Sequence, residues 1–192
     1  MTTLLDLLDG FTSYAWRLEA LDTYDIGDER EQFNDFMAGR TPKSSPDDLE
    51  WQARARSVVA SGRQIGRVRM VGHPITDYTR FEWAAYPNNI AAGEMIRVYD
   101  RTWPGGTDSR FEQDFWLFDD RIAAVMNYAS DGQFLGITIT EDVEPYLEIK
   151  QSALARSVPF DDYTLLPDPR VEGQVGRNRA AVTSEETSTS AH

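Results

Sequence analysis

The stretch from Asp114 to Thr140 constrains the fold most, because it reads as three consecutive strands separated by two short turns. Asp119-Asp120 supplies the first turn and Ser130-Asp131-Gly132 the second, and both consist of residue types that tight turns favour. We therefore predict a three-strand meander in the C-terminal half of the chain.

Aromatic side chains crowd this meander, and we expect them to form core contacts and cross-strand pairs: Phe115, Trp116, Phe118, Tyr128 and Phe134. An alternative is that the face of the first strand with Asp114, Trp116 and Phe118 lines a pocket or a docking surface. Trp116 on a sheet edge would then anchor an interface.

Apolar periodicity and capping residues predict the other elements. The pattern indicates helices over residues 4–11, 28–38, 45–61, 74–92 and 142–158, and strands over 65–71 and 94–100, with a weaker strand pattern at Trp16–Leu21. Pro87 is expected to break or kink the fourth helix. The strand–helix–strand order between residues 65 and 100 is typical of a βαβ unit.

Together these patterns predict an α+β domain over residues 1–166, followed by a disordered tail over 167–192. The expected sheet is mixed and mostly antiparallel, with about five strands that include the C-terminal meander and one βαβ unit. Helices are expected at the N-terminus, and one helix at the C-terminal end of the domain.

Composition excludes several functions. The net charge of −13 argues against direct nucleic-acid binding, and the absence of cysteine removes disulfides, thiol nucleophiles and thiolate metal sites. The two histidines, His73 and His192, are too few for a histidine-rich metal site. No apolar run approaches the ~20 residues of a membrane span, and the acidic start is unlike a signal peptide. We expect a cytoplasmic protein without membrane contact, cofactor or metal.

A run of arginines stands out in this acidic chain. Five occur within sixteen residues that contain no acid: Arg54, Arg56, Arg63, Arg67 and Arg69. Arg67 and Arg69 share one strand face, and if the strand with Arg97 is a neighbour, three guanidinium groups converge on a phosphate or carboxylate. The alternative is that these arginines pair with internal acids such as Glu82, Glu94 and Asp114.

Other candidate sites have plain structural alternatives. Tyr78 and Glu82 lie four residues apart on one helix face, where a buried carboxyl group acts as an acid or base, or simply holds the helix to the sheet. Asp119, Asp120 and Asp131 suggest a cation site but also suit turns. His73 would need a nucleophile that the sequence does not place.

Several segments resemble an actinobacterial family of uncharacterised domains, whose members are often encoded beside helix-turn-helix regulators. They span residues 11–150 and include Trp16-Arg-Leu-Glu19, Arg67-Val-Arg69, Asp77-Tyr78, Arg80-Phe-Glu82, Asn89-Ile-Ala-Ala-Gly-Glu94, Ile96-Arg97, Asp114-Phe-Trp-Leu-Phe-Asp-Asp120 and Phe134-Leu-Gly136. The resemblance implies a bacterial cytosolic protein and a transcription regulator as a partner. It carries over no catalytic residues.

The sequence therefore favours a non-enzymatic regulatory or interaction module, which binds a helix-turn-helix regulator or a small anionic ligand. The alternative is a metal-independent enzyme that uses carboxylates and arginines. The oligomeric state stays open. The candidate ligand- or partner-binding residues are Arg67, Arg69, Arg97, Tyr78, Glu82 and Trp116.

Overall fold

The computed structural model describes residues 2–25 and 27–164. The chain divides into two compact units after Pro159, and the second unit contributes to the described residues only the helix α6 (Phe160–Thr164). The predicted tail over 167–192, and the boundary before it, lie outside the described residues.

The first unit is α+β, as predicted. Its helices are α1 (Leu4–Gly10), η1 (Gly27–Glu29), α2 (Arg30–Met37), α3 (Pro46–Ala60), α4 (Asp77–Ala91), η2 (Ser109–Phe111) and α5 (Glu144–Arg156). Its strands are β1 (Tyr14–Glu19), β2 (Gln64–Val71), β3 (Met95–Asp100), β4 (Phe115–Phe118), β5 (Ile122–Tyr128), β6 (Phe134–Thr140) and β7 (Val158–Pro159).

All seven strands form one mixed sheet in the order β6-β5-β4-β1-β2-β3-β7, so the expected count of about five strands was too low. The pairs β1–β2 and β2–β3 are parallel, and the other four pairs are antiparallel. The predicted βαβ unit is β2-α4-β3. The meander β4-β5-β6 adds to β1, so β1 is a central strand with a parallel neighbour on one side and an antiparallel one on the other.

Local sequence explains where these elements begin and end. Thr3 and Ser45 each form a capping box with the acid three residues later, which satisfies the first backbone N–H groups of α1 and α3. Asp119 and Asp120 both adopt positive φ, 53° and 56°, which makes the tight turn between β4 and β5. The meander turn was therefore predicted from the residues that form it.

The helix α4 excludes one of the two alternatives expected at Pro87, the break, and leaves the kink as a prediction. It continues through Pro87 to Ala91 instead of breaking there. Pro87 itself is exposed, so its ring meets solvent and not the core. Tyr86 and Asn89, on either side of Pro87, are buried, and their packing holds the flanking turns in the helix.

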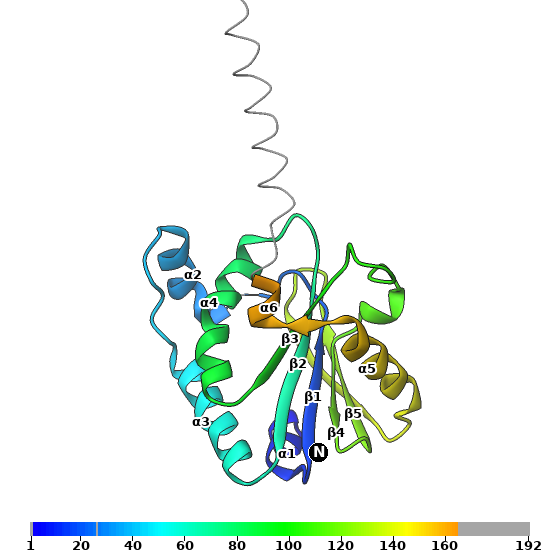
Figure 1. Cartoon of the computed structure of the whole chain (residues 1–192). Helices are drawn as coiled ribbons and strands as arrows, with labels where there is room; N and C mark the ends of the chain where they lie inside the picture. Colours follow the sequence, from blue (N-terminus) through cyan, green and yellow to red (C-terminus); the bar gives the residue numbers. More distant parts are fainter. Residues whose placement is uncertain (1, 26, 165–192) are drawn as a thin grey trace, which may run out of the picture. The chain divides into compact units, whose positions relative to one another are not determined.

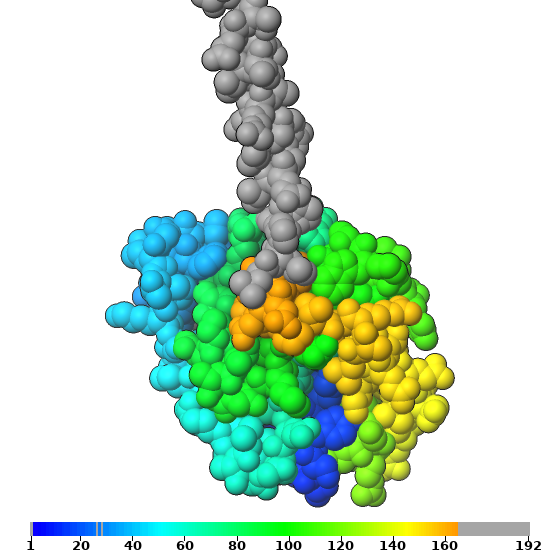
Figure 2. Space-filling view, viewed as in Figure 1, coloured from blue at the N-terminus to red at the C-terminus, as the bar shows by residue number. Residues whose placement is uncertain are grey.

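Helices cover both faces of the sheet. In Figure 1, α3 and α4 lie on one side of the strands and α5 on the other. The α5 face is apolar, and its buried residues include Leu18, Val68, Leu117, Ile149 and Ala153. The opposite face buries an apolar cluster with α1 and α3, and it also buries Val71, Ile96 and Val98 next to charged side chains. Residues of α3, in cyan, and of α4, in green, are neighbours at the surface (Figure 2).

Candidate functional site

The register of the parallel strands places four charged side chains side by side. Arg17 of β1 is opposite Arg67 of β2, and Glu19 is opposite Arg69. Side chains of paired residues point to the same face, so these four groups lie together under α3 and α4. Arg67 and Arg69 share a face as predicted, and Arg17 and Glu19 join them.

Arg97 does not belong to this group, which corrects the predicted convergence of three arginines. It is opposite Val68, whose side chain points to the α5 face. There its Nε donates to Oγ of Ser157 at 2.8 Å, and its Nη2 donates to the Ser157 carbonyl. A shift of one residue in register reverses the face, and sequence spacing alone did not give that register.

Glu19 is the centre of the charged group. Its carboxylate lies 3.0 Å from Nη1 of Arg17, 3.2 Å from Nη1 of Arg67 and 3.8 Å from Nη1 of Arg69. The hydroxyl of Tyr86 also donates to it at 3.2 Å. Burial opposes ionisation of Glu19, but the three arginines outweigh burial and hold its pKa well below the ordinary value.

Two further carboxylates complete the network. Asp114 accepts from Nη2 of Arg17 at 3.0 Å and from the backbone N–H of Ala20 at 2.6 Å. Glu94 accepts from Nε of Arg67 at 2.6 Å and from the indole N–H of Trp51 at 2.7 Å. Three arginines therefore contact three carboxylates, as the internal-pairing alternative expected for Glu94 and Asp114, and the network is electrically balanced.

Glu82 is a fourth carboxylic acid near the network, and none of the three arginines forms an ion pair with it. It is half-buried on α4 and forms no ion pair within the described residues. Burial raises its pKa, and the negative charge of Glu19 raises it further. The pKa of the buried Tyr78 phenol is also raised, first by burial and then by Glu82. No hydrogen bond joins these two side chains in the described part of the chain.

A hollow of about 330 Å³ opens over the network, and we call it the arginine pocket. Its floor is the sheet, and its walls come from α1, α3, α4 and, through Glu29, from η1. It is lined by Leu4, Leu8, Arg17, Glu29, Asp47, Asp48, Trp51, Arg67, Glu82, Ala85, Tyr86, Asn89, Trp116 and Met126.

Trp116 lines this hollow, as one of the sequence alternatives proposed, but it is not an edge residue. Its strand β4 lies between β1 and β5, and Trp116 is buried against Trp51 and Phe118. It therefore forms part of a pocket wall and cannot anchor a partner at a sheet edge. Arg69 is completely buried and does not reach the hollow.

Three polar groups at the arginine pocket have unused hydrogen-bonding capacity. One is Nε of Arg17, a donor that is buried without a partner. Asn89 is only 6% exposed, and its Oδ1 is buried without a partner. Nη2 of Arg67 donates no hydrogen bond in the described part of the chain, whereas Nε and Nη1 of the same side chain do. Buried polar groups in native proteins are nearly always paired, so an orphan carbonyl in a pocket wall indicates that something else supplies the donor.

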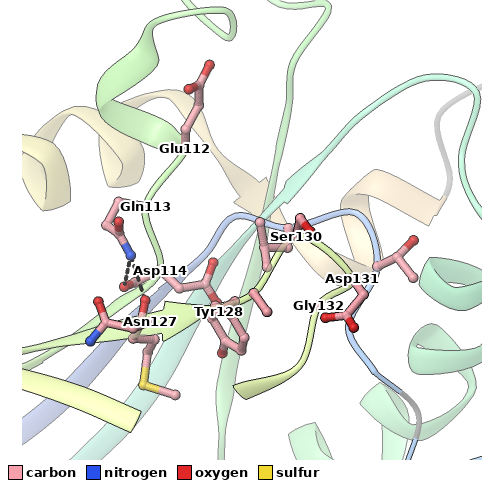
Figure 3. A pocket seen from close by; sticks show the side chains of 12 residues that line it. Glu112, Gln113, Asp114, Asn127, Tyr128, Ser130, Asp131 and Gly132 are labelled. Atoms are coloured by element: carbon pink, nitrogen blue, oxygen red, sulfur yellow. Dashed lines mark hydrogen bonds between the residues drawn. The ribbon is translucent and has the colours of Figure 1, made fainter. Parts of the chain in front are cut away.

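A second hollow, of about 530 Å³, lies where the segment after β1 meets β4 and the turn after β5. Figure 3 shows Gln113, Asp114 and Asn127 on one side of it, and Ser130, Asp131 and Gly132 on the other. Two of its polar side chains are used internally: Gln113 donates to the carbonyls of Asp114 and Met126, and the buried Asp114 accepts from Arg17 and from Ala20 N. We therefore regard the arginine pocket as the better candidate site.

The side chains at the other predicted sites have structural roles. Asp119 accepts from the backbone N–H groups of Thr12 and Ser13, at 2.7 Å each, and Asp131 accepts from Gln133 N within its turn. Nε2 of His73 lies 2.7 Å from Oδ2 of Asp100. The described residues contain no group of three or more potential metal ligands. Nor does any helix in this part of the chain have the length and apolar character to cross a membrane.

Comparison with protein families identifies the class of domain. Residues 2–165 match the model of a family described as a domain of unknown function, DUF6879, and the chain belongs to this family. A comparison with curated proteins finds no match. The match covers the sheet, the helices around it and every residue of the arginine pocket.

Of the residues that line the arginine pocket, sequence reasoning named only Arg67, Glu82 and Trp116 as site candidates. It missed Arg17 and Asn89, the acids Glu29, Asp47 and Asp48, and also Glu19 at the centre of the network. Arg17 and Glu19 alternate with Trp16 and Leu18 in the same way as Arg67 and Arg69 alternate with Val68, so a signal for them was present. Asn89 gave no signal, because an asparagine in a helix resembles any solvated polar residue until its burial is known.

Proposed function

We propose that this domain is a non-enzymatic binding module that takes a small organic molecule into the arginine pocket. The observation that carries the proposal is the side chain of Asn89, which is buried in the pocket wall with its Oδ1 unpaired. An unpaired buried carbonyl costs about 1–3 kcal/mol, and a ligand that donates a hydrogen bond recovers that cost.

The shape and support of the hollow fit this proposal. Its volume of about 330 Å³ falls within the range of small-molecule sites. Its floor consists of side chains from adjacent strands, and Arg17 and Arg67 are fixed there by carboxylates on two sides each. A site whose walls are held in place before binding loses less free energy to ordering.

The ion-pair network bears on which ligand is bound. The sequence suggested a small anion held by arginines, yet each arginine of the network already contacts at least one internal carboxylate. An anion would have to compete with these carboxylates at a buried site. The network therefore favours a neutral or cationic ligand, and the anion remains a prediction that the experiment below also tests.

A second candidate function is an acid-base enzyme, and Glu82 is the observation that favours it. Its carboxyl group lines the pocket, and burial raises its pKa, as a general acid requires. Glu82→Gln distinguishes the two functions once a ligand is known. A binding module keeps the ligand chemically unchanged in both proteins, whereas an enzyme converts it and loses turnover in the variant.

The role that the bound molecule serves is also part of the proposal. The resemblance noted in the sequence associates this family with helix-turn-helix regulators, so we propose that the domain contacts such a regulator and that the ligand modulates the contact. Co-purification of the chain with a regulator encoded beside it, with and without ligand, tests this step. If the regulator co-purifies equally with and without ligand, regulator binding and ligand binding are independent roles.

The binding proposal is tested by a thermal-shift screen of anionic, neutral and cationic small molecules against the whole chain. Hits are repeated with Asn89→Leu and with Asn88→Leu, a matched control because Asn88 is exposed on the same helix and lies outside the arginine pocket. We expect hits whose shift is lost in Asn89→Leu and kept in Asn88→Leu. The proposal would be overturned if no molecule of any class shifted the melting temperature, or if the shifts were unchanged in Asn89→Leu.

A further inference from the structure

We infer that the ligand of the arginine pocket is an organic amine in its cationic form, with the ammonium group near the acidic wall and an apolar body against the aromatic residues. This inference rests on the proposed function, since it names the class of molecule that the same pocket binds.

The first argument is the charge around the hollow. Four acids line it, Glu29, Asp47, Asp48 and Glu82, against two arginines, Arg17 and Arg67. Both arginines are neutralised from below by Glu19, Glu94 and Asp114. The acids of the wall are therefore the charges without a cationic partner, and to the extent that they are ionised they attract a cation and repel an anion.

These acids also lack cations of their own. Glu29, Asp47 and Glu82 form no ion pair within the described residues, and Asp48 accepts from Ser45 N at 2.8 Å in the cap of α3. Lys43, which borders an adjoining hollow together with Glu29 and Glu82, is exposed and forms no ion pair in the described part of the chain. A cation that enters the pocket can therefore act as the counter-ion of these acids.

The acids repel one another where they stand. Burial raises the pKa of Glu29 to about 7, and Glu82, Asp48 and Asp47 contribute to the rise. A bound ammonium group would relieve this repulsion, because an opposite charge within a few ångströms favours the ionised carboxylate. In the free pocket the carboxylates repel one another, and in the complex each of them is attracted to the ammonium group.

The aromatic walls suit the same class of molecule. Trp51, Tyr86 and Trp116 line the hollow, and they already accommodate cations. The guanidinium carbon of Arg67 lies 5.7 Å from the ring centroids of Trp51 and Tyr86, and that of Arg17 lies 6.0 Å from Trp116. Leu4, Leu8 and Met126 add apolar surface for the body of the ligand.

Asn89 supplies the second, independent observation and narrows the class. Its unpaired atom is the acceptor Oδ1, so the missing partner is a donor. A primary or secondary ammonium group has N–H donors, whereas a quaternary ammonium group has none. The pocket therefore fits an amine that satisfies the acidic wall by charge and Asn89 by a hydrogen bond.

The test uses three probes with one ring and different charge: cyclohexylammonium, cyclohexanol and cyclohexanecarboxylate. Affinities for the whole chain are measured by NMR titration at pH 7.5 and low salt. We expect cyclohexylammonium to bind at least tenfold more tightly than cyclohexanol, and cyclohexanecarboxylate to bind most weakly. The preference should fall in Glu82→Gln and in Asn89→Leu, and persist in the control Asn88→Leu.

The outcomes separate this inference from the proposed function. If cyclohexanol matches the amine, or the carboxylate binds most tightly, in an Asn89-dependent manner, the cation inference is overturned and the pocket remains a binding site. The same conclusion follows if the screen yields only neutral or anionic ligands that depend on Asn89. If neither the three probes nor the screen shows Asn89-dependent binding, both fail.

Discussion

On the face of the sheet that α5 covers, Leu18, Val68 and Leu117 are completely buried among apolar neighbours. The face under α3 and α4 instead carries three arginines and their carboxylates beside a hollow. Both faces come from the same strands, because neighbouring residues of a strand point to opposite sides. The comparison teaches that one sheet separates an apolar layer from a layer of buried ion pairs beside the proposed binding pocket.

The apolar face is stabilised without any specific partner, since apolar burial is roughly proportional to area. The charged face is stable only as a complete set, because removing one member leaves the others buried without compensation. Leu18 and Glu19 are adjacent in β1 and point to different faces, so substitutions at these two positions compare the faces directly.

The largest effect is expected for Glu19→Gln. The change removes the charge that contacts Arg17, Arg67 and Arg69, so uncompensated positive charge remains buried, at a cost of about 3–5 kcal/mol. Urea unfolding followed by fluorescence measures the loss, with the exposed Glu112→Gln as control. A loss below about 1 kcal/mol would show that the network contributes little to this face.

Leu18→Ala should come next on the apolar face. It leaves a cavity between the sheet and α5, and substitutions of this kind lower the free energy of unfolding by about 2–5 kcal/mol. The same urea experiment measures it. Because Leu18 points away from the arginine pocket, the affinity for cyclohexylammonium should stay within about twofold of the native chain, and a larger change would mean that the two faces are coupled.

Asn89→Leu should stabilise the ligand-free protein. The substitution removes a buried carbonyl without a partner and improves helix propensity, which together are worth about 1 kcal/mol. Thermal unfolding of this variant and of Asn88→Leu provides the comparison. If Asn89→Leu is less stable than the native chain by a similar amount, the amide is part of the packing, and the unpaired carbonyl no longer indicates a ligand.

The smallest effect concerns pH. A pKa of about 7 for Glu29, above its ordinary value, means that the folded state binds this proton more tightly than the unfolded state does. Its contribution to stability is fully present below about pH 4 and is lost as pH rises through 7. Glu29→Gln should flatten this part of the stability profile.

Glu29 is half-buried, so screening keeps the change below about 1 kcal/mol. The groups that face it are Glu82 of α4, Asp47 and Asp48 of α3, and the nearby Lys43. Urea unfolding at pH 5 and at pH 8 measures the slope, and Glu112→Gln is again the control. A slope equal to that of the native chain would show that the acidic wall carries no repulsion.

Much of the fold could be predicted from sequence because its signals are local. Ser45 with Asp48 begins α3, Asp119-Asp120 turns the meander, and alternation in β2 places Arg67 and Arg69 on one face. Each depends on residues within a few positions of one another, and the physical chemistry of caps, turns and pleats acts at that range.

The candidate site depends on contacts between residues that are far apart in the sequence. Arg97 was assigned to the wrong face because register between β2 and β3 is a property of two strands, and a slip of one residue reverses the side chain. Glu19 became the centre of the network only when β1 lay beside β2, and Asn89 became notable only when the helix buried it. The sequence by itself determined which residues carry charge and which element holds each of them. Tertiary structure decided which charges meet and which buried polar groups remain unpaired, since Coulomb energy and desolvation depend on distances and burial that no local pattern contains.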